Sequence, residues 1–132
     1  YPLDVIKGFR TMEQYEACQK AGLVPKMVNG KMALIRQIDL DFVDEMGRTN
    51  LTRMQNGLAA LDPATGEAYQ LHHIGQKMDS TLAILTRAEH MQNGNNKIWH
   101  IFGKSSEIDH KVFAKQSKAF WKYMAELLQG GF

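Results

Sequence analysis

Two adjacent histidines, His72 and His73, end the segment YQLHH, which has the composition of a β-strand. Adjacent side chains on a regular strand point to opposite faces, so each histidine would need its own task. One imidazole could bind a metal ion while a second, neutral imidazole takes a proton from water. We expect the first role for His72 and the second for His73, with Gly75 supplying the bend that lets both reach one site.

Two further histidines, His90 and His100, could complete a metal site. On one straight helix they would lie roughly 15 Å apart along the axis and roughly 80° apart around it, too far for one ion. Residues 93–96, Asn-Gly-Asn-Asn, supply a break, because both residue types tolerate the left-handed conformation that ends helices. The sequence therefore allows His72, His90 and His100 to share one divalent ion with an open fourth position, as catalytic sites have.

The elements that must position these residues follow from local patterns. A turn at residues 62–66 leads into the strand with the histidine pair, and 82–85 is a second apolar run of strand length. Thr86 and Glu89 form a capping box, so a helix is expected to begin at Arg87. The expected order is strand, loop, strand, helix.

Segments on both sides predict further elements. A helix is expected over 11–21 from the capping box Thr11-x-x-Gln14, and a hairpin turn at Asn29-Gly30. A short helix is expected over 50–56 and a long one over 106–128. The aromatic side chains of the long helix lie on its apolar stripe, which favours core packing over base stacking for Phe120 and Trp121.

Composition bounds the answer without naming a partner. The 132 residues suit one domain, and a net charge of +2 permits nucleic-acid binding without demanding it. The lone Cys18 is expected to be a buried hydrophobe, and the acidic segment 39–45 a solvated turn. No apolar run approaches membrane-spanning length and no signal-peptide pattern opens the chain, so we expect this piece to be soluble.

The segment 61–100 resembles the LHH family of the HNH/endonuclease VII nuclease superfamily, with the naming triplet at Leu71-His72-His73. The run LHHIGQK followed by LAILTRAEH carries the resemblance. Flanking segments such as GLVPKMVNGKMALIRQIDLD look like the same group, which forms C-terminal ends of bacterial polymorphic toxins, including LXG-type proteins. Around the histidines the chain is also similar to colicin DNases.

The resemblance implies His73 as general base and His72, His90 and His100 as metal ligands. The family generally has an Asn supporting the base at the second strand, where this chain has Asp79-Ser80-Thr81. Colicin-like sites space their last two histidines one helical turn apart, whereas His90 and His100 are ten positions apart in this chain. A water or Asp79 is the alternative to His100. Lys77, Arg87 and Lys97 are candidate phosphate contacts, with a solvated surface role as the alternative.

We therefore expect an α+β domain over residues 1–132, with a ββα-metal (His-Me finger) core at about 61–102, an N-terminal helix and hairpin, and a long C-terminal helix. The resemblance implies a monomeric, metal-dependent DNA endonuclease with little sequence preference, using one Zn, Mg, Mn or Ni ion. It also implies an antibacterial toxin, secreted within a larger protein, active in the target cell's cytoplasm and blocked by an immunity protein.

Three alternatives remain open at this point. An RNase on the same scaffold would keep the four histidines and differ in its substrate. A non-catalytic zinc-binding interaction module would bind metal without cleaving and would tolerate loss of His73. A toxin that only binds DNA would show salt-sensitive binding without cleavage.

Overall fold

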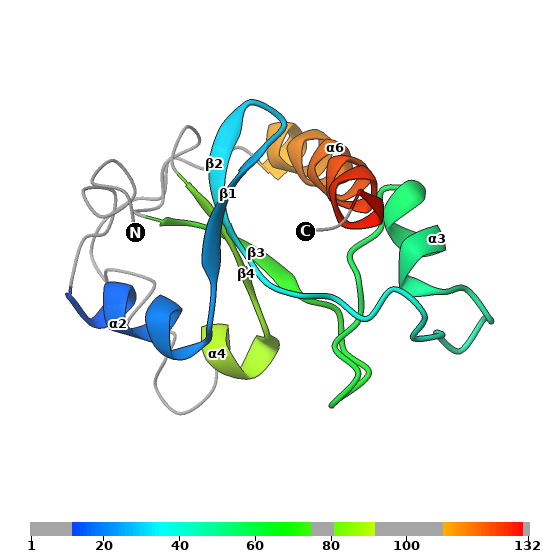
Figure 1. The fold of residues 1–132 in the computed structure, drawn as a ribbon, viewed down its shortest axis with the longest axis horizontal. Coiled ribbons are helices and arrows are strands. Elements are labelled where there is room, and N and C mark those ends of the chain that lie inside the picture. Colours follow the sequence, from blue (N-terminus) through cyan, green and yellow to red (C-terminus); the bar gives the residue numbers. More distant parts are fainter. Residues whose placement is uncertain (1–11, 75–80, 92–109, 131–132) are drawn as a thin grey trace.

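The computed structural model describes residues 12–74, 81–91 and 110–130, which form a four-stranded sheet with helices on both of its faces (Figure 1). The elements, in chain order, are α2 (Met12–Lys20), β1 (Val24–Val28), β2 (Lys31–Ile35), α3 (Asn50–Gln55), β3 (Gln70–His73), β4 (Leu82–Leu85), α4 (Arg87–Met91) and α6 (His110–Gln129). This α+β arrangement, with a strand–strand–helix unit made by β3, β4 and α4 and a long C-terminal helix, confirms the expected fold class.

The strands stand in the order β1-β2-β4-β3. β1 and β2 form the predicted antiparallel hairpin, and Asn29 (φ 52°) and Gly30 (φ 80°) both adopt the left-handed conformation that such a two-residue turn requires. β3 and β4 are also antiparallel, whereas β2 and β4 run parallel. The parallel pair joins the hairpin to the strand–strand–helix unit in one sheet.

Alternate residues of β4 join two separate hydrophobic clusters, one on each face of the sheet. Leu82 and Ile84 belong to the cluster on the α6 side, and Ala83 and Leu85 belong to the cluster on the α2 side. All four positions of this strand are buried, as expected for a strand covered on both faces. A residue's place along these strands therefore decides which helix its side chain meets.

Helix α6 packs on the sheet through Phe120, Trp121 and Met124, which are 4%, 1% and 0% exposed. The prediction that the two aromatic residues belong to the core is confirmed. Gly57 (φ 81°) follows the end of α3, and a side chain at this position would collide with the Lys118 side chain of α6. Within the described ranges, no helix combines the length and the apolar character needed to cross a membrane.

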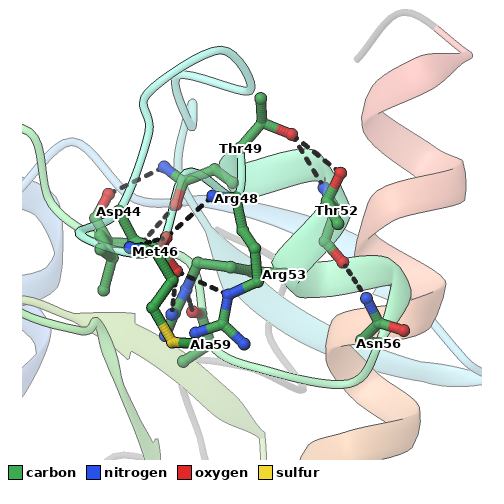
Figure 2. A network of polar contacts seen from close by, with 10 residues as sticks. Asp44, Met46, Arg48, Thr49, Thr52, Arg53, Asn56 and Ala59 are labelled. Carbon is green, nitrogen blue, oxygen red and sulfur yellow. Dashed lines mark hydrogen bonds and ion pairs between the residues drawn. The ribbon is translucent and has the colours of Figure 1, made fainter.

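The acidic segment 39–45 differs from the solvated turn predicted for it at one residue, Asp44. The Asp44 side chain is 6% exposed, and its Oδ2 lies 2.9 Å from Arg48 Nε and 2.8 Å from Arg53 Nη1 (Figure 2). Burial alone would raise the pKa of Asp44, but hydrogen bonds from backbone N–H groups and from both guanidinium groups hold it well below its usual value. The other three carboxylates are exposed as expected: Asp39, Asp41 and Glu45.

Candidate active site around the histidine pair

His72 and His73 end β3 and are both buried, at 5% and 3% exposure. In the antiparallel pairing with β4, His72 stands opposite Ala83 and His73 stands opposite Leu82. Directly opposed residues in such a pair have their side chains on the same face. His72 therefore shares the α2 side of the sheet with Ala83, and His73 shares the α6 side with Leu82, as the alternation of a regular strand predicts.

The His73 ring is held by two residues of α6. Its Nε2 atom lies 2.9 Å from Oε1 of Gln116, and its ring meets Phe113 edge to face, with centroids 4.5 Å apart and planes at 63°. Burial lowers the pKa of His73, Lys31 lowers it further, and the hydrogen bond to Gln116 acts in the opposite direction. The net shift is downward, so His73 is a neutral imidazole at neutral pH and can accept a proton.

His72 lies on the side of the sheet that α2 covers, and its Nε2 atom is shielded from solvent. Cys18 of α2 is buried on this side, where burial raises the pKa of its thiol to about 12 and Glu89 adds to the shift. The thiol is thus protonated at neutral pH, which confirms Cys18 as a buried hydrophobe. The imidazole of His72, at the end of β3, is a group of the type that binds divalent ions through nitrogen.

Helix α4, which carries His90, begins at the predicted capping box. The Thr86 backbone N–H donates to Glu89 Oε1 at 2.8 Å, and the Glu89 N–H donates to Thr86 Oγ1 at 3.1 Å. Glu89 also binds Arg36 of the segment after β2, through Nη1 to Oε1 at 2.7 Å and Nη2 to Oε2 at 3.1 Å. The first turn of α4 is therefore tied both to the end of β4 and to the segment that follows β2.

The charges of this ion pair stabilise each other in a partly buried setting, with side chains 15% and 30% exposed. Burial alone would raise the pKa of Glu89, but hydrogen bonds from Arg36 and from Thr86 bring it below its usual value. Burial alone would lower the pKa of Arg36, but the nearby Glu89 carboxylate outweighs this effect and raises the pKa above its usual value. Arg36 also stands over the Tyr69 ring, with Cζ 5.4 Å from its centroid.

Several predicted site residues fall outside what the structure describes. These are Gly75, Lys77, Asp79, Lys97 and His100, together with the side chain of His90. Among the described side chains, no three His, Cys, Asp or Glu residues gather as metal ligands would. Arg87 is described: it is 60% exposed and pairs with Glu67 at 3.1 Å. The three-histidine metal site and the phosphate contacts stay predictions.

From the sequence we did not predict the roles of Gln116, which contacts His73, or of Arg36, which binds Glu89 at the start of α4. Gln116 is a polar residue within the apolar face of α6, three residues after Phe113 and four before Phe120, and that placement was the available signal. Arg36 directly follows an apolar strand, and nothing nearby in the sequence indicates its partner, 53 residues away. Both contacts depend on how α4 and α6 pack on the sheet.

The family model described as a nuclease of the HNH/ENDO VII superfamily with conserved LHH matches residues 49–126, more than half of the chain. The chain belongs to the LHH nuclease family. In this LHH nuclease the triplet Leu71-His72-His73 stands at the end of β3, and the matched range runs from α3 into α6, so it includes Gln116. No curated protein and no solved structure gave a match.

Proposed function

We propose that this LHH nuclease is a metal-dependent endonuclease that hydrolyses DNA phosphodiester bonds with little sequence preference. The observation that carries the proposal is the Leu71-His72-His73 triplet at the end of β3, within the family match and followed by β4 and α4. Hydrolysis of a phosphodiester needs an activated water, a means of neutralising phosphate charge, and stabilisation of the leaving oxygen.

His73 would take the proton from the attacking water. A general base must be neutral before the reaction, and the buried surroundings of His73 favour its uncharged form. The ring must also be held while the proton moves, and Gln116 and Phe113 of α6 hold it on one side. The described contacts of His73 thus suit a base that is uncharged and positioned in advance.

His72 would hold the metal ion together with His90 and, in our proposal, His100. When bound, a divalent ion neutralises charge on the scissile phosphate and stabilises the leaving oxygen. The imidazole of His72 is a suitable ligand for such a site. A single residue separates α4 from β4, the strand that pairs with β3 and its His72. The Arg36–Glu89 pair would fix the start of the helix that carries His90.

Exposed lysines on α6 would supply sequence-independent contacts to the nucleic-acid backbone. They recur at helical spacing and are Lys111, Lys115, Lys118 and Lys122. This spacing places them on one side of α6, opposite Phe113 and Gln116. They would bind phosphates at a distance from the reacting one, and their contribution should weaken as salt concentration rises.

The antibacterial part of the proposal is supported by the likeness of the flanking segments to bacterial toxin domains. In this proposal the domain is delivered within a larger secreted toxin, acts as a monomer in the cytoplasm of the target cell, and is neutralised by an immunity protein in the producing cell. The exposed carboxylates of the segment 39–45 are the proposed contact for that partner. Reversing these charges should weaken immunity binding, and unchanged affinity would remove the segment from the interface.

The experiment that tests the activity offers the purified domain supercoiled plasmid and, separately, purified RNA. Each reaction contains magnesium, manganese, zinc or nickel, with a chelator as control. We expect nicking of the plasmid that requires a metal and little cleavage of RNA. Cleavage of RNA alone would make the domain an RNase, and tight zinc binding with no cleavage of either substrate would make it an interaction module.

A further inference from the structure

The hydrogen bond between His73 and Gln116 determines which ring nitrogen can act as a base. Neutral imidazole carries one proton, so one nitrogen donates and the other accepts. The atom that faces Nε2 of His73 is Oε1 of Gln116, at 2.9 Å. A carbonyl oxygen only accepts hydrogen bonds, so this contact is a hydrogen bond when Nε2 carries the proton, which leaves the lone pair on Nδ1.

Gln116 is placed to make this contact by the packing of α6. It lies between Phe113 and Phe120 on the side of the helix that meets the sheet, and Phe120 is buried in the core. Trp121 and Met124, buried in the following turns, fix the helix against the same face. The amide of Gln116 therefore reaches His73 from a firmly packed helix, 43 residues away in the sequence.

We propose that Gln116 is a positioning residue that holds His73 in its Nε2–H tautomer and leaves Nδ1 as the atom that accepts the proton from water. The role of Gln116 in cleavage rests on the proposed function, whereas the assignment of the His73 tautomer does not. The edge contact with Phe113 supports the assignment. It restricts rotation of the His73 ring, so the orientation of the ring does not depend on Gln116 alone.

Two substitutions at position 116 distinguish a side chain that accepts a hydrogen bond from Nε2 of His73 from one that donates a hydrogen bond to it. A carboxylate only accepts, so Gln116→Glu should keep the proton on Nε2. An ammonium group only donates, so Gln116→Lys should bind the Nε2 lone pair and move the proton to Nδ1. Gln129→Met, at an exposed position of α6, controls for changes in the helix itself.

The tautomer is read from the ¹⁵N chemical shifts of the His73 ring by NMR, at a pH at which the ring is neutral and without nucleic acid. We expect Nε2–H in the wild type, in Gln116→Glu and in Gln129→Met, and Nδ1–H in Gln116→Lys. A wild-type ring protonated at Nδ1, or the same tautomer in the Glu and Lys variants, would overturn the proposal. Far-UV circular dichroism of each variant shows that the fold is kept.

Plasmid cleavage then connects the tautomer to the reaction. Gln116→Lys should lower the cleavage rate by about 10-fold or more, although its added positive charge favours DNA binding, and Gln116→Glu should retain more activity at saturating DNA. Equal rates in the two variants despite opposite tautomers would overturn the role of Gln116 in cleavage. Absence of cleavage in every protein, with the tautomers as expected, would count against the proposed function and leave the tautomer assignment standing.

Discussion

The two faces of the sheet hold their functional elements by different means. On the α6 side, His73 contacts an amide and an aromatic ring, neither of which carries a charge. On the α2 side, the first turn of α4 is fixed by the ion pair between Arg36 and Glu89. A general base must stay neutral and keep its orientation, so uncharged hydrogen-bond partners suit it. The start of a helix must be fixed in place, and a charged pair does that more strongly than a neutral hydrogen bond.

This comparison predicts that the charged contact contributes more to stability than to orientation of His73. Glu89→Gln replaces the carboxylate oxygen that accepts from the Thr86 backbone N–H with an amide oxygen that can also accept, and it removes the charge opposite Arg36. We expect the free energy of unfolding to fall by about 1.5–3 kcal/mol, measured by urea denaturation. The His73 ring shifts should stay as in the wild type, because Glu89 and Gln116 belong to different faces of the sheet.

A matched control is the exposed ion pair between Arg87, the first residue of α4, and Glu67, which lies before β3. Glu67→Gln removes the charge opposite Arg87, in a pair whose side chains are 60% and 45% exposed. Exposed pairs contribute about 0–1 kcal/mol, so this variant should unfold almost as the wild type does. A loss as large as that in Glu89→Gln would show that burial does not distinguish the two pairs and would break the comparison.

A pH-limited effect is expected at Asp44, a buried carboxylate held by two arginines. Its folded-state pKa lies below the ordinary value of 3.8, so its stabilisation is complete above that value and is lost as pH falls through the folded pKa. The difference in unfolding free energy between wild type and Asp44→Asn should be constant above about pH 5 and should shrink only in more acidic solution. A difference that disappears between pH 5 and 8 would contradict the assignment.

Local patterns predicted the elements of the site but not the contacts between them. The turn at Asn29-Gly30, the strand at Leu82–Leu85 and the start of α4 at Arg87 were predictable because each depends on residues close in sequence. The parallel pairing of β2 with β4 was not, because it joins residues roughly fifty positions apart.

The same limit applies to the candidate site. The opposite orientation of His72 and His73 followed from strand alternation, whereas their burial depends on how the helices cover the two faces of the sheet. The amide that holds His73 comes from a helix 43 residues further on, and its role appears only once α6 packs on the sheet. Asp44 was expected in solvent because an acidic run suggests it, and the two arginines that bind it follow only four and nine residues later.

The most direct test of the central claim measures plasmid cleavage and bound metal on the same preparations of wild type, His73→Ala and His90→Ala. We predict that His73→Ala keeps its metal and loses cleavage by roughly 100- to 10,000-fold, the usual contribution of a general base. His90→Ala should lose both the metal and the activity. Cleavage by His73→Ala at the wild-type rate, or metal content unchanged in His90→Ala, would contradict the roles assigned to the two histidines.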